Sequence, residues 1–296
     1  MARVSMRHLR YFHALAEHRH FGHAAEACAI SQPALSLQIK ELEQALGATL
    51  VERGNRQTRL TGLGVEIAER VLSILAAVDE LEDVARAHGG ALSGPFPLGL
   101  IPTVAPYLLP QIVRRLAASH PGLELHPREA VTQTLLDGVG QGGLDAAILA
   151  LPLDDPGLTA RPLFEEEFVL LRPAADGGRP VPEAKDLATM RLLLLEEGHC
   201  FRDQALSYCD LASVSPGRHL EASSLSTLVQ MVGAGMGVTL IPEMAISLET
   251  RSANVSVARL PAPVATRQIG LVWRRTSPFG PQMEQISEVL ADLGPR

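Results

Sequence analysis

The first fifty residues combine runs of helical periodicity with tight turns. Apolar positions three and four apart predict a helix over residues 6–18 and a short helix over 21–29. A third helix is predicted to begin after Ser31, a favourable N-cap, and to end at Gly47. Pro33 fits its first turn, where a missing N–H costs no hydrogen bond.

A basic hairpin predicted over residues 50–60, with its turn at Gly54-Asn55, completes the element order of a winged helix-turn-helix. In such folds the third helix enters the major groove of DNA with its N-terminal end. The candidate base-reading residues at that end are Ser31, Gln32, Pro33, Ser36 and Gln38. Arg53 and Arg56 on the hairpin suit contacts to phosphate or to the minor groove. A three-helix module that binds another protein is the alternative.

A long helix is predicted from Thr61 to about residue 88. Its apolar positions repeat every four and three residues, at Ile67, Val71, Ile74, Val78, Leu81 and Ala85. This heptad stripe predicts a dimerisation helix. Packing of the stripe against the same chain is the alternative.

From residue 95 onward, short apolar strands alternate with helical stretches, which predicts an α/β fold with mainly parallel sheets. The expected strands cover 96–100, 123–128, 145–149, 168–172, 191–195, 219–222, 237–241 and 268–273. The expected helices cover 106–119, 132–140, 199–211, 224–233, 243–250 and 281–293. Two similar blocks, near 95–150 and 190–242, predict two subdomains with a cleft between them.

Charge separates the N-terminal region from the remainder. Residues 1–60 hold eight Lys/Arg and five Asp/Glu, a net of +3, whereas the 296-residue chain carries −7. A basic head on an acidic body predicts a polyanionic partner for the head alone. No apolar run is long enough for a membrane span and no secretory signal is expected, so the three cysteines point to the reducing cytoplasm.

Cys200 and Cys209 are the candidate reactive residues of the α/β region. Gly198 precedes a predicted helix, which places Cys200 in or beside the first turn, where an anion is stabilised. His199 and Arg202 supply possible cations, so Cys200 is a candidate thiolate of lowered pKa. The neighbouring acidic residues 196 and 197 would oppose that effect.

The spacing of this pair conflicts with a disulfide on an intact helix. Nine residues at about 1.5 Å each separate the two Cα atoms by roughly 13–14 Å and place the side chains on opposite faces. A disulfide needs Cα atoms within roughly 7 Å, so its formation would require this segment to refold. Two buried core cysteines are the alternative; no metal site or cofactor is expected, because no second His/Cys pair completes a ligand set.

Motifs along the whole chain resemble the LysR-type transcription regulators. They include 9–12, Ala24-Ala25, the run Ile30-Ser31-Gln32-Pro33-Ala34-Leu35-Ser36, Leu60-Thr61, the stretch 233–237 and Leu240-Ile241-Pro242. The resemblance implies a winged helix-turn-helix over 1–61, a linker and dimerisation helix over 62–90, and a sensor over 91–296. The sensor would comprise two Rossmann-like subdomains similar to periplasmic binding proteins, the first at about 95–163 and 268–296, the second at about 164–267. Promoter DNA, a homodimer or homotetramer and RNA polymerase are the implied partners, with no membrane.

Three further segments resemble the peroxide-sensing OxyR branch of that family: 100–110, 129–132 and 197–205 with a cysteine at 209. The resemblance implies that Cys200 is the peroxidatic cysteine and Cys209 the resolving one, reset by a thiol reductant. It places Thr103 and Thr132 beside the peroxide, with His199 and Arg202 tuning the site. Arg128 stands where relatives often carry histidine, and Cys28 is expected in the core of the head.

Three functions compete at this point. The first is a regulator, expected to be an activator, switched by thiol oxidation at Cys200 and disulfide formation with Cys209. The second is a LysR-type regulator that binds a small metabolite in the cleft. The third, a thiol peroxidase, leaves the DNA-binding head without a purpose, so we do not expect an enzyme.

Overall fold

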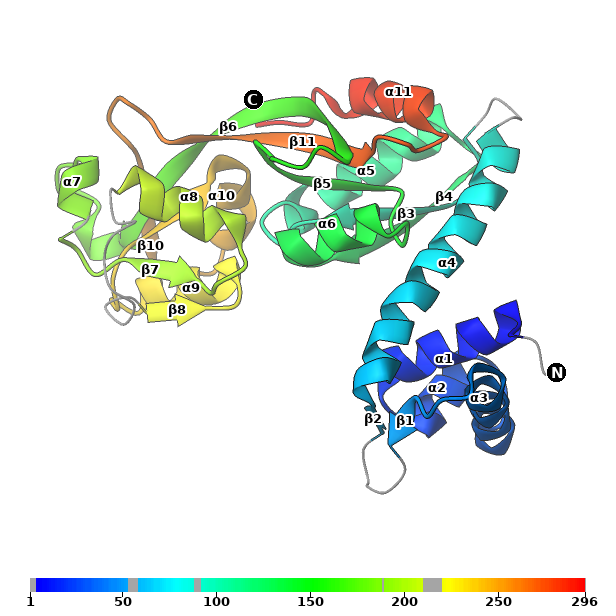
Figure 1. Ribbon diagram of the computed structural model, residues 1–296. Helices are drawn as coiled ribbons and strands as arrows, with labels where there is room; N and C mark the ends of the chain where they lie inside the picture. Colours follow the sequence, from blue (N-terminus) through cyan, green and yellow to red (C-terminus); the bar gives the residue numbers. More distant parts are fainter. Residues whose placement is uncertain (1–3, 53–57, 88–91, 188, 210–219, 296) are drawn as a thin grey trace. The chain divides into compact units, whose positions relative to one another are not determined.

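The computed structural model describes residues 4–52, 58–87, 92–187, 189–209 and 220–295. It divides into two compact units, residues 1–85 and 86–296, each with its own apolar core (Figure 1). Arg53 and Arg56, the hairpin residues expected to contact DNA, lie outside the described residues.

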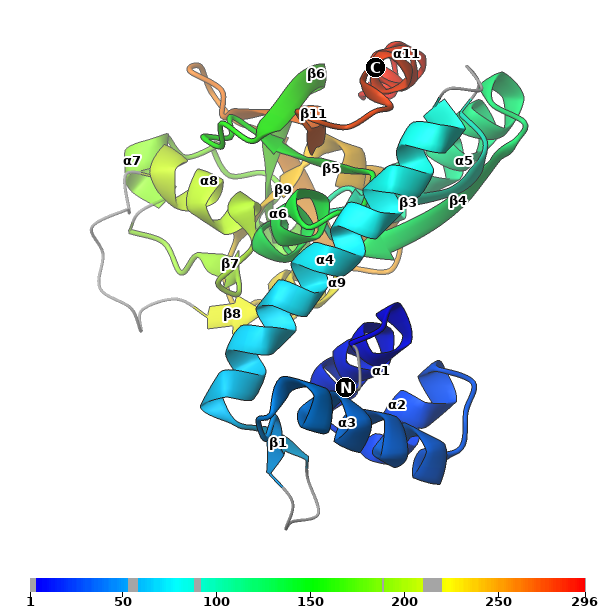
Figure 2. The same cartoon turned by 45° about the vertical axis from the view of Figure 1, so that its right-hand side comes forward.

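The first unit contains the helix-turn-helix formed by α1 (Met6–His18), α2 (Phe21–Ala27) and α3 (Gln32–Leu46) (Figure 2). Ser31 caps α3 by accepting a hydrogen bond from the amide of Ala34, and Gly47 ends it in a left-handed conformation at φ 68°. The two strands β1 (Val51–Glu52) and β2 (Arg59–Leu60) pair antiparallel as the base of the hairpin. Fully buried side chains from all three helices form the core, among them Phe12, Leu15, Leu35, Ile39 and Leu42.

The long helix α4 (Gly62–Ala87) uses its heptad stripe in two ways. Val71 is buried in the head core and Ile67 packs against it, as does Leu75 from outside the stripe. Further along, Ile74 and Leu81 are 46% and 70% exposed. The first two positions of the stripe therefore complete the head, whereas Ile74 and Leu81 stay exposed.

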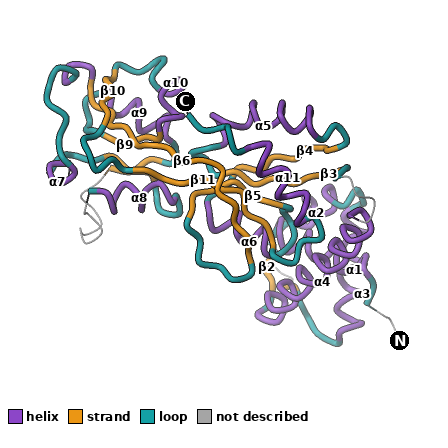
Figure 3. Tube along the Cα trace, turned by 90° about the horizontal axis from the view of Figure 1, so that it is seen from above, coloured by secondary structure: helices purple, strands orange, loops and turns teal. Residues whose placement is uncertain are grey.

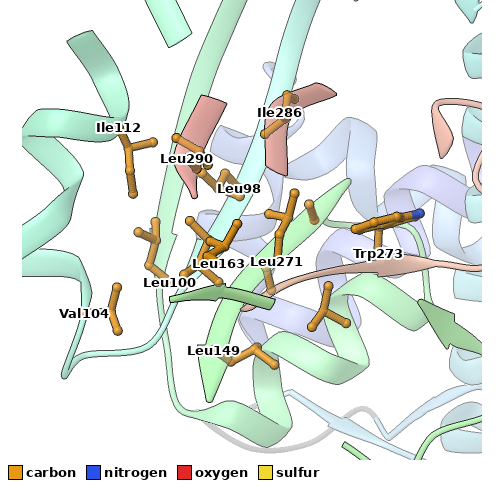
Figure 4. Packing of buried hydrophobic residues seen from close by; sticks show 14 of the residues in the cluster. Leu98, Leu100, Val104, Ile112, Leu149, Leu163, Leu271, Trp273, Ile286 and Leu290 are labelled. Carbon is orange, nitrogen blue, oxygen red and sulfur yellow. The ribbon is translucent and has the colours of Figure 1, made fainter. Parts of the chain in front are cut away.

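The second unit holds two subdomains, which we define by their cores. Core residues of the first subdomain lie at 92–163 and 269–293, and those of the second at 168–265. In the first, β3 (Gly94–Leu100) pairs in parallel with β4 (Leu123–Glu129) and β5 (Ala146–Leu151). The surrounding helices are α5 (Ala105–Ser119), α6 (Thr132–Gly140) and α11 (Gly280–Leu290), and Figure 4 shows part of the packing.

The second subdomain has shorter strands: β7 (Leu193–Leu195), β8 (Leu220–Ala222), β9 (Thr239–Pro242) and β10 (Val255–Arg259). Its longer helices are α8 (Cys200–Tyr208) and α9 (Leu225–Gly233). Four short helical turns complete it: η1 (Ala174–Asp176), α7 (Ala184–Leu187), η2 (Glu243–Ala245) and α10 (Ile246–Glu249).

Two long strands, β6 (Leu158–Pro173) and β11 (Thr266–Arg274), join the subdomains (Figure 3). Residues 158–167 of β6 pair with β11, whereas residues 168–173 pair with β9 and β10. All of these pairings are antiparallel, as is that of β11 with β5. The sheet is therefore mixed and not mainly parallel as expected, because β6 and β11 run back along the strands of both subdomains.

Candidate functional site

A narrow cavity, too tight in this structure to admit a water molecule, lies where the two subdomains meet, and Cys200 is in its wall. Residues from three segments line it: Ile101, Pro102, Thr103, Val131, Thr132, His199, Cys200 and Phe201. The structure thus brings together Cys200, Thr103, Thr132 and His199, four of the residues expected at the site.

Three helices begin at this cavity. Cys200 is the first residue of α8, Thr132 is the first residue of α6, and α5 begins two residues after Thr103. The N-cap residues of all three helices, at 104, 131 and 199, make no side-chain cap hydrogen bond. Since N-terminal amides and the helix dipole favour negative charge, this arrangement stabilises an anion in the cavity.

The chain turns into α8 at a glycine. Gly198 has φ 93°, in the left-handed region that side-chain-bearing residues disfavour. This turn brings Cys200 to the wall of the cavity directly after His199. The sequence rule of a glycine before a helix N-terminus therefore located the thiol correctly.

The two threonine hydroxyls differ in their surroundings. The Thr103 hydroxyl accepts a hydrogen bond from the Arg267 guanidinium at 2.8 Å, so its own proton is free to point elsewhere. The buried Thr132 hydroxyl has no hydrogen-bond partner among the described residues. An unpartnered buried hydroxyl is costly, and a polar ligand for which the cavity widened would satisfy it.

Arg267 is the main residue that the sequence analysis missed. It lies on β11, and its fully buried side chain pairs with Glu166 of β6 at 2.7 Å. It also donates to the Thr103 carbonyl at 3.0 Å and stacks 5.4 Å from the centre of the Phe201 ring. Burial raises the pKa of Glu166, and the Arg267 charge opposes that rise. This pair supports the cavity wall behind Thr103.

The expected cations do not act as the sequence suggested. Burial lowers the pKa of His199, against smaller opposing effects of Glu196 and Glu129, which favours a neutral ring in the cavity wall. The guanidinium of Arg202 donates to the Leu195 carbonyl at 2.8 Å and to Glu221 at 2.7 Å. Arg202 is not among the residues that line the cavity, because these partners hold it elsewhere.

Arg128 is also outside the cavity lining. It is exposed on β4, where it pairs in register with Gly99 of β3. Its neighbour Glu129 projects toward the opposite side of the strand and acts on the pKa of His199 and of Tyr107. The position expected to modify the site is therefore occupied by a solvent-exposed charge.

The two cysteines of the sensor unit belong to different cores. Cys200 is partly buried and packs against the first subdomain, whereas Cys209 is fully buried in the second. Burial raises the pKa of Cys209 to about 11, so it remains a thiol at neutral pH. Both thiols are free, and the intact nine-residue helix α8 begins at Cys200 and ends at the residue before Cys209.

We expect the pH dependence of folding to include a contribution from His199. Because burial lowers its folded-state pKa, this contribution is complete above its unfolded value, near 6.5, and is lost as pH falls through the lower folded value. NMR titration of the ring should give a midpoint below 6.5, with a smaller acid loss of stability in His199→Gln. A midpoint at or above 6.5 would contradict this assignment.

In the head, Ser31, Gln32, Pro33 and Ser36 are exposed at the N-terminal end of α3, as base-reading residues must be. Gln38 differs, because its amide donates to Glu41 at 2.8 Å. Glu41 in turn lies 3.6 Å from His8 of α1. Gln38 therefore bonds to a residue of its own helix and would have to leave Glu41 to reach a base.

Within the described ranges, no helix is long and apolar enough to cross a membrane. The same residues contain no group of three or more His, Cys, Asp or Glu placed to hold a metal ion. The partly exposed Cys28 lies at the C-terminal end of α2, where burial raises its pKa.

Comparison with known families matches both parts of the chain. Residues 6–65 match the bacterial regulatory helix-turn-helix protein model of the lysR family, and residues 89–294 match the LysR substrate binding domain. The chain therefore belongs to the LysR family of transcriptional regulators.

Within that family, several similar proteins are named for hydrogen peroxide or as OxyR. A probable hydrogen peroxide-inducible genes activator of Streptomyces viridosporus is 43% identical, covering 97% of this chain and 94% of the relative. A full-length cysteine-to-aspartate mutant of OxyR from Pseudomonas aeruginosa is 34% identical with a TM-score of 0.74, over 98% of this chain and 96% of that structure. A cysteine-to-serine mutant of OxyR from Corynebacterium glutamicum, solved with hydrogen peroxide bound, is 36% identical with a TM-score of 0.66, over 98% of this chain and 92% of that structure. The chain is thus placed in the OxyR branch.

Proposed function

We propose that this protein is a DNA-binding regulator that senses hydrogen peroxide through Cys200, with Cys209 as the resolving thiol. The main support for this proposal is the cavity, which combines the Cys200 thiol with two threonine hydroxyls at the starts of three helices. A peroxide oxygen can accept from one hydroxyl and donate to another group, which suits Thr103 and the unpartnered Thr132. The similar structure from C. glutamicum was solved with hydrogen peroxide bound, which supports the same ligand here.

The chemistry proceeds in two balanced steps. The Cys200 thiolate attacks one peroxide oxygen, the O–O bond breaks, and the departing hydroxide takes a proton to become water. Cys209 sulfur then attacks the resulting sulfenic acid, a disulfide forms, and a second water leaves. Two thiols lose two electrons in total, and one peroxide becomes two waters. Burial of Cys209 keeps it protonated, so Cys200 is the thiol that reacts first.

The second step requires α8 to come apart. Along an intact helix, residues 200 and 209 are separated by roughly 13–14 Å of rise, about twice the Cα separation that a disulfide permits. Phe201 and Ala205 are buried in the core of the second subdomain and must leave it when the helix unwinds. Oxidation therefore alters the packing of the second subdomain as well as the helix.

The remaining assignments extend from this function. We assign DNA binding to 1–61, dimerisation to 62–90 and sensing to 91–296, with the two cores as the two subdomains. The exposed Ile74 and Leu81 of α4 suit a dimer contact, and pairing of dimers would give a tetramer. Ser31, Gln32, Pro33 and Ser36 would read bases, with Arg53 and Arg56 on phosphates. RNA polymerase and a thiol reductant are the further partners.

Thiol counting tests the proposal directly. One equivalent of peroxide added to the reduced chain should lower the free thiols from three to one, leaving Cys28. Hydrogen exchange across 200–208 should accelerate, because the amide protection of α8 is lost. In Cys209→Ser the reaction should stop at a sulfenic acid. Unchanged thiols, or a disulfide formed with unchanged protection, would rule out this mechanism.

A further inference from the structure

The head contains an open pocket of about 680 Å³ at the base of the hairpin. The C-terminal end of α1, the first residues leading to α2, β2 and the start of α4 surround it. Its lining consists of His18, Arg19, His20, Thr58, Arg59, Leu60 and Val65. Two of these seven residues are arginines and none is acidic, which makes the pocket a source of positive potential.

The two arginine side chains of this pocket form no ion pair within the described part of the head. Within the described part of the head, glutamates lie beside His8, His13 and His23, and Arg70 pairs with Glu66 on α4. Arg19 and Arg59 are exposed and form no ion pair with any described residue. The Thr58 amide donates to the Arg19 carbonyl at 3.2 Å, which fixes the two basic walls against each other. An anion between them would relieve this uncompensated charge.

His20 adds a donor that does not depend on charge. Its Nδ1 accepts hydrogen bonds from the amides of Gly22 at 3.1 Å and His23 at 3.3 Å. An accepting nitrogen carries no proton, so the ring is neutral and its N–H is at Nε2. The N-cap role of His20 therefore fixes the tautomer that donates away from the helix.

Arg19 occupies an unusual backbone position for its residue type. It caps α1 in the left-handed region at φ 49° and ψ 25°, where glycine or asparagine costs less. The helix end alone would favour glycine. An arginine here is consistent with a role for its side chain in the pocket.

The location of the pocket identifies its ligand. In a helix-turn-helix, the first helix of the pair crosses the DNA backbone while the second reads bases. The pocket adjoins the start of α2, which is that first helix, and the hairpin strand β2. We propose that it binds one phosphodiester of the DNA backbone through Arg19, His20 and Arg59, separately from the base contacts of α3. This inference rests on the proposed DNA-binding function.

Salt-dependent binding of the full-length protein tests the proposal. Specific and non-specific duplexes are titrated between 50 and 200 mM salt. Arg59→Ala and Arg19→Gly should each reduce the slope of log K against log salt by about 0.9, equally for both duplexes. Raising the salt from 50 to 200 mM then weakens DNA binding by each variant about 3.5-fold less than it weakens binding by wild type. His20→Asn, which retains a capping side chain, should weaken binding with an unchanged slope, because a neutral donor releases no counterion.

Arg70→Ala is the control, since it removes an exposed charge from α4 of the same unit, outside the pocket. A methylphosphonate scan of the duplex should reveal one position whose neutralisation weakens wild type but not Arg59→Ala. Slopes equal to that of Arg70→Ala, with no such position, would overturn the pocket while leaving the DNA-binding function intact. Failure of wild type to bind any duplex would instead overturn both.

A free anion is the other source of the same chemistry. Inorganic phosphate is titrated into the DNA-free protein while the His20 ring is followed by NMR. Two results together would assign the pocket to a small anion and overturn the DNA assignment. The first is saturation of the His20 shifts at millimolar phosphate. The second is that phosphate displaces the duplex equally well from wild type and from Arg59→Ala. Weak, unsaturated shifts are the expected result.

Discussion

Replacing Cys200 by serine should abolish the response to hydrogen peroxide while leaving DNA binding by the reduced protein unchanged. The thiol lies in the wall of the sensor cavity, and the base-reading end of α3 lies in the other compact unit. Serine retains the size and helix position of the residue but cannot form a sulfenic acid. Footprints of wild type and Cys200→Ser, recorded with and without peroxide, provide the measurement.

Two further variants sharpen this experiment. Cys28→Ser removes the thiol of the head and should respond like wild type. Cys209→Ser should still consume one peroxide yet fail to reach the disulfide state. If Cys200→Ser shifts its footprint on oxidation as wild type does, then Cys200 is not the sensor.

Replacing Arg267 by methionine should lower the free energy of unfolding of the sensor unit by roughly 3–5 kcal/mol. Both partners of the Arg267–Glu166 pair are fully buried, so the variant leaves the Glu166 carboxylate without a counter-charge. Thr103 also loses two hydrogen bonds and its fixed position in the cavity wall. Urea unfolding of the reduced protein measures the loss, and the rate of thiol oxidation should fall with it.

The double variant Glu166→Gln/Arg267→Met is the control for this prediction. Removing both charges should restore part of the lost stability, because a buried pair often contributes little beyond neutral residues of similar size. It should not restore the rate of oxidation, since Thr103 remains unsupported. Equal stability of the single and double variants would show that the buried charge is not the cause.

The helices that the sequence predicted best are those whose ends carry their own signals. The predicted bounds of α1 and α6 match the structure, and Ser31 and Gly47 mark the ends of α3 as expected. Helical periodicity and capping residues act over a few positions, so a short stretch of sequence is enough to predict these helices.

The strands were harder to predict from the sequence than the helices, as β6 illustrates. Residues 168–172 were predicted, but the strand covers Leu158–Pro173. Its first part contains Pro162 and three consecutive glutamates, which resemble a loop. Pairing with β11, a hundred residues away in the chain, overrides that local preference. The edge strand β10 was missed entirely.

The residues of the candidate site were predicted only in part. The cysteine pair, the helix start and both threonines followed from the chain and its resemblance to a family, whereas Arg267 did not. A signal existed, because Arg267 alternates with the exposed Thr266 and Gln268 and shares the inward face with Ile269. An arginine at an inward strand position requires a buried partner, and that partner, Glu166, lies 101 residues away.

The path of the chain also bears on its synthesis. The second subdomain is inserted into the first: β3, β4 and β5 precede it, whereas β11 and α11 follow it. A ribosome therefore completes the core at 168–265 while the first sheet still lacks the strand that covers β5. That gap lasts on the order of ten seconds at ordinary elongation rates. During it, the apolar edge of Ala146–Leu151 is open to chaperones and to other nascent copies, a hazard set by connectivity rather than by any weakness in the finished fold.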